Sequence, residues 1–209
     1  MIHETLVVGA FQCNCHILAD EKTKEAVVID PGDKAREILA ALKTLGVNVK
    51  YLLHMHAHLD HVMGTRAVHE KTDGKILLHP ADAPLYAMLS KQASMFGFDA
   101  EDPHAVDGPL ADGQRVEFGR HALDVLHTPG HTPGSCCFRL DGGRRLLFSG
   151  DTLFARSIGR TDLWGGDFDA EIASIRAKIL TLDDDTVVYP GHGAETRVGE
   201  ERRKNPFLI

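Results

Sequence analysis

A short histidine-rich segment carries the clearest chemistry in the sequence. The segment HAHLDH, residues 56–61, supplies three imidazoles and one carboxylate within six residues. Imidazole binds zinc, iron and related ions, and a carboxylate adds negative charge that balances a second cation. The segment contains no cysteine, which argues against a closed structural zinc site. One tetrahedral ion that keeps a position for water cannot accept all of these side chains, so two ions are indicated.

Three further candidate ligands lie at the ends of predicted strands. Each follows an apolar run in a turn rich in glycine or proline, in the sequences TPGH, SGD and YPGH, and the candidates are His131, Asp151 and His192. Proline restricts and glycine permits unusual backbone dihedrals, so such turns can present one side chain rigidly. The pattern therefore predicts that these side chains complete the site begun by residues 56–61.

The elements that must position these side chains follow from hydrophobic periodicity and turn residues. Apolar β-rich runs predict strands over 5–8, 13–18, 26–29, 49–53, 75–78, 115–118, 122–126, 135–140, 145–148 and 186–189. Helical spacing predicts helices over 35–45, 62–70, 81–91, 172–182 and 198–204. Each half places strands before helices without regular alternation, which is typical of an α+β arrangement of sheets between outer helices.

Composition narrows the class of protein. A length of 209 residues favours one domain, and a net charge of -7 argues against a nucleic-acid partner. No apolar run is long enough for a membrane helix, and the N-terminus lacks the pattern of a signal peptide, so we expect a cytoplasmic protein with no membrane partner. The cysteines are expected to be buried and unpaired rather than disulfide-bonded; they are Cys13, Cys15, Cys136 and Cys137. The oligomeric state is left open.

The sequence resembles the metallo-β-lactamase-fold superfamily, and within it the short bacterial hydrolases similar to glyoxalase II (hydroxyacylglutathione hydrolase). The resemblance extends from VIDPG at 28–32, through the ligand motifs, to GEERRKNPF at 199–207. It implies an α+β fold, the αβ/βα four-layer sandwich in which two mixed β-sheets lie between outer helices. It also implies a single domain over residues 1–209, without the C-terminal helical domain that two-domain glyoxalase II enzymes carry.

Carried over by motif, the resemblance implies two metal sites that share a carboxylate. One ion would be held by His56, His58 and His131, the other by Asp60, His61 and His192, with Asp151 bridging both. Zinc is the expected metal, and iron or manganese also suits sites of this kind.

The implied activity is hydrolysis of thioesters such as S-lactoylglutathione. Hydroxide shared by the two ions would attack the carbonyl, and a thiolate would leave without needing a strong general acid. Asp60 is the catalytic candidate, because it could orient the nucleophile or pass a proton. Weaker candidates for substrate contact are Phe96, Arg160 and Arg202. The expected partner is therefore a small thioester, with a glutathione conjugate as one option.

Two other interpretations stay open. A persulfide dioxygenase would use His56, His131 and Asp151 on a single Fe(II), although the sequence PGHG at 190–193 resembles the hydrolase form of the last ligand loop. A non-catalytic metal-binding module is the third class. The sequence Arg160-Thr161-Asp162 resembles both the short hydrolases and the dioxygenases. An ion pair between Arg160 and Asp162 that braces the loop is its favoured interpretation. Lactamase subclasses that have cysteine at position 151, or lack the bridging aspartate, are set aside.

Overall fold

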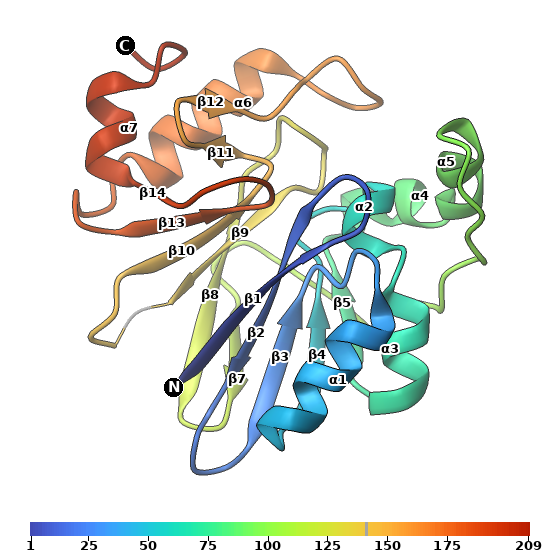
Figure 1. Cartoon of the computed structure of the whole chain (residues 1–209). Helices are drawn as coiled ribbons and strands as arrows, with labels where there is room; N and C mark the ends of the chain where they lie inside the picture. The colour runs from blue at the N-terminus through green and yellow to red at the C-terminus, as the bar shows by residue number, and fades with distance from the viewer. Residues whose placement is uncertain (141) are drawn as a thin grey trace. The chain divides into compact units, whose positions relative to one another are not determined.

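Two mixed sheets organise the chain, and Figure 1 shows them in a computed structural model that describes residues 1–140 and 142–209. The chain divides into two compact units. The first unit comprises Met1–Leu110 and Glu117–His121, and the second comprises Ala111–Val116 and Ala122–Ile209. The expectation that the 209 residues form a single domain stays a prediction. Within the described part of the chain, no helix has both the length and the apolar character that crossing a bilayer requires.

The first sheet changes from antiparallel to parallel pairing along its order β1-β2-β3-β4-β5-β6. Its strands are β1 (Ile2–Val8), β2 (Cys13–Ala19), β3 (Glu25–Ile29), β4 (Asn48–Leu53), β5 (Lys75–Leu78) and β6 (Gly108–Pro109). β3, β4 and β5 are parallel neighbours, and Ile29 of β3 pairs with Leu53 of β4. The residues that follow these two strands therefore emerge at the same edge of the sheet.

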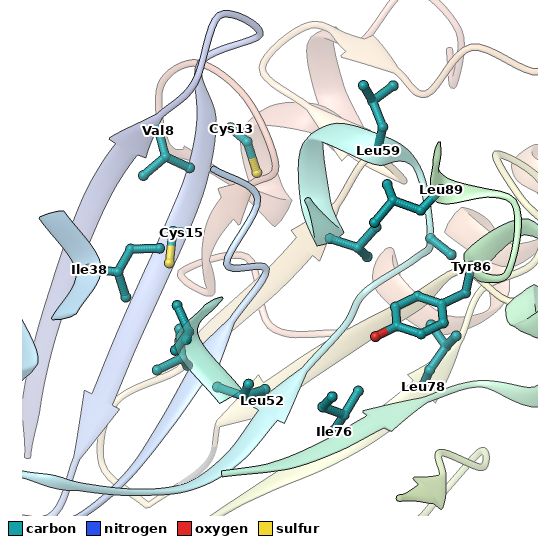
Figure 2. Packing of buried hydrophobic residues seen from close by; sticks show 14 of the residues in the cluster. Val8, Cys13, Cys15, Ile38, Leu52, Leu59, Ile76, Leu78, Tyr86 and Leu89 are labelled. Atoms are coloured by element: carbon teal, nitrogen blue, oxygen red, sulfur yellow. The ribbon is translucent and has the colours of Figure 1, made fainter. Parts of the chain in front are cut away.

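Helices cover the first sheet and share its apolar core. α1 (Ala35–Leu45) ends at Gly46, and α3 (Thr65–Thr72) packs against α1, β4 and β5 (Figure 1). Figure 2 shows this core at close range, where Ile38 of α1 lies beside Cys15 of β2. Leu59, which precedes the candidate ligand Asp60, belongs to the same cluster. The segment that carries these candidate ligands is thus anchored in the core through its apolar residues.

The second sheet has the order β14-β13-β10-β9-β8-β7, with a parallel pairing of β10 and β13. Its strands are β7 (Arg115–Phe118), β8 (His121–His127), β9 (Cys136–Leu140), β10 (Leu146–Gly150), β13 (Val187–Pro190) and β14 (Thr196–Arg197). A two-stranded ribbon of β11 (Leu153–Phe154) and β12 (Ser157–Ile158) accompanies it. α6 (Phe168–Ser174) continues into a π-helical turn over Ile175–Ile179, and α7 (Val198–Lys204) follows β14.

Two predicted helices are shorter than expected. The helix predicted over 62–70 is broken into α2 (Leu59–Val62) and α3, because the N–H of Gly64 donates to the carbonyl oxygen of Gly32 at 3.1 Å instead of continuing the helix. Glycine allows this close approach, since a Cβ at position 64 would lie 2.6 Å from the carbonyl oxygen of Pro31. The helix predicted over 81–91 consists of a 3-10 turn (Pro80–Asp82), α4 (Ala83–Tyr86) and α5 (Leu89–Met95). Pro84 lies in the first turn of α4 and has no amide hydrogen, so it cannot donate the hydrogen bond that would join α4 to the preceding turn.

Candidate functional site

The first unit gathers its candidate ligands at the end of β4. His56 and His58 lie in the extended segment that follows the strand, and Asp60 and His61 lie in α2. The ring centroid of His56 lies 4.8 Å from that of His58 and 4.0 Å from that of His61. Asp60 Oδ2 lies 3.6 Å from His61 Nε2. These four side chains form the first half-site.

Asp30 fixes the orientation of His61. Asp30 follows β3, and its Oδ2 lies 2.7 Å from His61 Nδ1, with both side chains fully buried. A carboxylate only accepts, so Nδ1 carries the hydrogen and Nε2 presents its lone pair. Asp30 Oδ1 accepts the backbone N–H of Met55 at 2.8 Å. The Sγ of Cys13 lies 3.6 Å from the same Nδ1, and burial raises the pKa of this thiol to about 12, so it stays protonated.

Two more buried side chains hold the backbone that carries the candidate ligands. Asp82 Oδ2 accepts the N–H of Ala57 at 2.9 Å. Gln92 of α5 accepts the N–H of Leu59 at 3.1 Å and donates to the carbonyl oxygens of Ala57 and Leu85 at 3.1 and 2.8 Å. A segment outside regular structure has its backbone groups satisfied in this way, which fixes its path.

The second half-site centres on Asp151. Asp151 follows β10, His131 lies in the turn after β8, and His192 follows β13. Asp151 Oδ2 lies 3.6 Å from His131 Nε2, and Asp151 Oδ1 lies 3.6 Å from His192 Nε2. Each carboxylate oxygen therefore faces a different histidine, which is the arrangement expected of a bridging ligand.

Loop and helix contacts hold His131 in place. Its Nδ1 donates to the carbonyl oxygen of Arg160 at 2.7 Å, so its Nε2 presents a lone pair, as in His61. Its backbone N–H donates to Glu171 Oε2 at 2.9 Å. Gly130 has a φ of 152°, and a Cβ there would overlap Glu171. Glu171 is fully buried on α6, and this burial raises the pKa of its carboxyl to about 8.

The spacing of nitrogen and oxygen atoms fits a metal ion. Nε2 of His61, His131 and His192 each lies 3.6 Å from a carboxylate oxygen, which is too far for a hydrogen bond. Two ligands bound at 2.0 to 2.2 Å around one tetrahedral zinc ion would lie about 3.4 Å apart. With each Nδ1 of His61 and His131 occupied by an acceptor, the Nε2 atoms are prepared to bind a cation.

The remaining candidate residues lie outside these half-sites. Arg160 forms a two-contact ion pair with Asp162, each contact 2.8 Å long, as the interpretation of a braced loop predicts. This ion pair holds the pKa of Asp162 down at about 2. Arg202 donates to the carbonyl oxygens at the end of the second unit's π-helical segment and pairs with Asp184. Phe96 is 52% exposed, and substrate contact by these residues stays a prediction.

Several functional contacts had no clear signal in the sequence. Asp30 belongs to a turn motif, and the pairing of β3 with β4 places it beside the residue that follows Leu53, which a prediction of parallel strands could have indicated. Gln92 and Glu171 are polar residues on short helices, where an exposed position is the ordinary expectation. The four cysteines are free and buried, as predicted.

Comparison with known proteins gives a consistent family assignment. A family model described as the metallo-beta-lactamase superfamily matches residues 8–192. The hydroxyacylglutathione hydrolase GloC of Haemophilus influenzae is 38% identical over 207 residues, which cover 98% of this chain and 97% of that protein. The mitochondrial persulfide dioxygenase ETHE1 of Bos taurus is 32% identical over 198 residues, covering 92% of this chain and 70% of that protein.

Solved structures confirm the expected fold class of two mixed sheets with flanking helices. The BLEG-1 B3 metallo-beta-lactamase superposes with a TM-score of 0.92 at 35% identity, over the full length of both chains. The TTHA1623 protein, solved in a di-iron-bound form, superposes with a TM-score of 0.89 at 39% identity, over 98% of this chain and 100% of that one. With its ligand motifs and both sheets in this arrangement, the chain belongs to the metallo-beta-lactamase superfamily.

Proposed function

We propose that the chain is a binuclear metal-dependent hydrolase of thioesters. The proposed ligand set joins both half-sites, with His56, His58 and His131 on one ion, Asp60, His61 and His192 on the other, and Asp151 on both. The order of motifs in the family supports this pairing. The family as a whole suggests a metal-dependent enzyme, and the relative named as a hydroxyacylglutathione hydrolase supports the thioester assignment.

The observation that carries the proposal is the position of Asp151. Its two oxygens face His131 and His192 separately, each at 3.6 Å. A single ion would need only one of these oxygens, whereas two ions use both. Asp60 beside His61 repeats the same nitrogen–oxygen spacing in the other unit. A second, separate set of donors therefore favours two ions over one.

The chain's own residues divide the remaining tasks. Two bound cations would lower the pKa of a shared water from about 15.7 toward about 7, which makes hydroxide available near neutral pH. Asp60, 16% exposed at its side chain, can accept a proton or orient the nucleophile. Asp30 and the Arg160 carbonyl keep the imidazoles of His61 and His131 in the tautomer that binds a cation. A thioester suits this arrangement, since its thiolate leaves without a strong general acid.

Metal content tests the proposal directly. Protein purified anaerobically without added metal should contain two ions per chain, with zinc the expected metal and iron or manganese also compatible. Thioester hydrolysis should then be measured with S-lactoylglutathione and simpler thioesters. A β-lactam belongs in the same screen, because a structural neighbour is described as a B3 metallo-beta-lactamase.

A mononuclear iron persulfide dioxygenase is the second candidate, supported by the ETHE1 relative. It would need His56, His131 and Asp151 on one iron, and would leave His192 without a ligand role. One iron per chain, together with oxygen uptake in the presence of glutathione persulfide, would replace the hydrolase assignment. Two ions together with thioester turnover and no oxygen uptake would exclude the dioxygenase.

A further inference from the structure

Three phenylalanines form an aromatic cluster in the first unit. Phe11 lies in the turn between β1 and β2, and Phe96 and Phe98 follow α5. The ring of Phe11 lies 5.6 Å from each of the other two rings, edge-on to Phe96 and tilted to Phe98. Phe11 is 38% exposed and Phe96 52% exposed. Phe11 and Phe96 thus present aromatic surface to solvent, while Phe98 is partly buried against the apolar core of this unit.

The cluster adjoins a candidate metal ligand. Phe11 and Phe98 line one hollow together with Met63, Asp33 and Asp60. The hollow itself is too small for a substrate. A substrate at Asp60, the proposed ligand and proton acceptor, would instead meet the rings at their solvent-exposed rim. An apolar wall next to the reacting centre is the usual composition of a small-molecule site.

Acidic side chains surround this wall. An adjoining hollow shares Asp33 and Met63 and is also lined by Asp99 and Glu101. Arg66, the cation in its described lining, has its Nε 3.2 Å from Glu70 Oε1 and 3.0 Å from Glu101 Oε2. The charge of this exposed arginine is therefore balanced, and the surface around the wall, apart from the proposed ions, offers poor electrostatic complementarity to carboxylates.

We propose that this aromatic wall, Phe11, Phe96 and Phe98, selects thioesters with an apolar, uncharged acyl or thiol group over glutathione thioesters. The proposal rests on the thioesterase function above and names its substrate class. Apolar groups gain free energy by leaving water against the rings. Glutathione carries two carboxylates and a net negative charge, which the acidic surroundings repel.

A pair of substrates tests the wall with metal-loaded protein. The phenylacetyl and acetyl thioesters of N-acetylcysteamine differ by one phenyl ring. Phe11→Ala and Phe96→Ala should each lower kcat/KM for the phenylacetyl thioester about tenfold, mostly through KM, and leave the acetyl thioester nearly unchanged. Phe207→Ala, which removes a ring that is 45% exposed in the second unit, is the matched control and should change neither.

A charge-reversal variant tests whether the acidic surroundings of the wall disfavour glutathione thioesters. Asp99→Lys reverses an exposed charge beside the wall and should raise kcat/KM for S-lactoylglutathione about threefold at low salt, with the gain lost at high salt. Asp73→Lys makes the same charge change at the exposed end of α3 and should have no such effect. Equal responses in the two variants would mean that the acidic surroundings of the wall do not select substrates.

Binding separates this proposal from the proposed function. A thioether analogue of the phenylacetyl thioester cannot be hydrolysed, and calorimetry should show weaker binding to Phe11→Ala than to the wild type. If the wild type hydrolyses no thioester but still binds the analogue more tightly than Phe11→Ala does, the proposed thioesterase function is wrong and the proposed role of the aromatic wall stands. If thioesters are hydrolysed but every variant shows the same preference for the phenylacetyl thioester, the proposed role of the aromatic wall is wrong and the thioesterase function stands. The same conclusion follows if S-lactoylglutathione is the better substrate.

Discussion

The Asp30 carboxylate decides which nitrogen of His61 faces the candidate metal. Its two oxygens have separate tasks, since one accepts from His61 Nδ1 and the other from the N–H of Met55. Removing charge from an outer carboxylate usually weakens metal binding, because ring orientation and ligand basicity both depend on it. A substitution at Asp30 can therefore change the binding of the second proposed ion while every proposed ligand stays in place.

Asp30→Asn should weaken binding of that ion about 10- to 100-fold. An amide has one acceptor oxygen and one donor nitrogen, so it cannot accept from both His61 and Met55. Competition with a chromogenic chelator measures the affinity. Asp112→Asn, which alters a carboxylate bound to Lys178 and His127 in the second unit, is the control. Unchanged affinity in Asp30→Asn would mean that Asp30 supports only the fold.

Sequence patterns indicate the candidate ligands but not the side chains that orient them. HAHLDH has dense spacing, and the later ligands have distinctive turns, so the residue types alone predict a metal site. Asp30, Glu171 and Gln92 contribute through contacts between segments 31 to 40 residues apart in the chain. Such contacts depend on tertiary packing, which a local pattern does not encode.

Burial of His16 predicts a dependence of stability on pH. Desolvation lowers the pKa of His16 to about 3, and the neighbouring His3 adds to the shift. The unfolded chain binds this proton more readily, so the group stabilises the fold above about pH 6.5 and that stability is lost as pH falls toward 3. The loss should approach 1.4 kcal/mol per pH unit at most, by an order-of-magnitude conversion of about one proton.

His16→Gln should flatten this dependence. Urea unfolding of chelator-treated protein at pH 7.5, 6.0 and 5.0 gives the free energy of unfolding in each variant. The chelator removes the competing effect of metal release at low pH. Parallel curves for wild type and His16→Gln would contradict the assignment of the acid sensitivity to this side chain.

At the scale of elements, strands were predicted better than helix interruptions. β5 and β7 have the predicted bounds, and so do α1 and α7. Strand limits follow from apolar runs that end at turn residues. The break after α2 depends on the close approach of Gly64 to Gly32 and Pro31, and the separation of the 3-10 turn from α4 depends on Pro84. The first of these causes is tertiary and has no signature in periodicity.

α5 positions the segment of candidate ligands, although part of its own surface is exposed. Figure 2 shows Leu59 and Leu89 in one apolar cluster, so α2 and α5 pack together. Gln92 adds three hydrogen bonds, two of which go to the segment that carries His56 and His58. A shift of α5 would therefore displace the ligand segment.

Gln92→Leu should weaken metal binding as well as the fold. The substitution keeps the volume and removes the partner of the buried Leu59 N–H and of the Ala57 carbonyl oxygen, at about 1–3 kcal/mol for each buried group, whereas the Leu85 carbonyl oxygen still accepts from the N–H of Met88. Hydrogen exchange of the Leu59 amide should accelerate, and chelator competition should show reduced affinity. Gln114→Leu removes an amide that accepts from Ala111 in an exposed turn and serves as the control. A lower Tm of the metal-free protein with unchanged metal affinity would reduce Gln92 to a purely structural role.

At the scale of the whole molecule, the motifs predict the superfamily and its mixed sheets. They do so because the candidate ligands follow the ends of strands, so the spacing of the motifs reflects the order of the strands. The proposed ligands come from both compact units, so metal binding should stabilise the chain as a whole. Free metal at 1,000 times Kd adds about 4 kcal/mol per site. For a chain of this length each kcal/mol raises Tm by about 2–4 °C.

Removing the metals should therefore lower Tm by about 8 °C or more for each ion lost. Calorimetry of the purified protein before and after chelator treatment measures the shift, and adding zinc back should restore it. Asp151→Ala should show a much smaller shift, because the proposed bridging carboxylate serves both ions. Asp112→Asn keeps all proposed ligands and should show the full shift. A full shift in Asp151→Ala would mean that the ions are bound without the bridge, and the binuclear assignment would then be wrong.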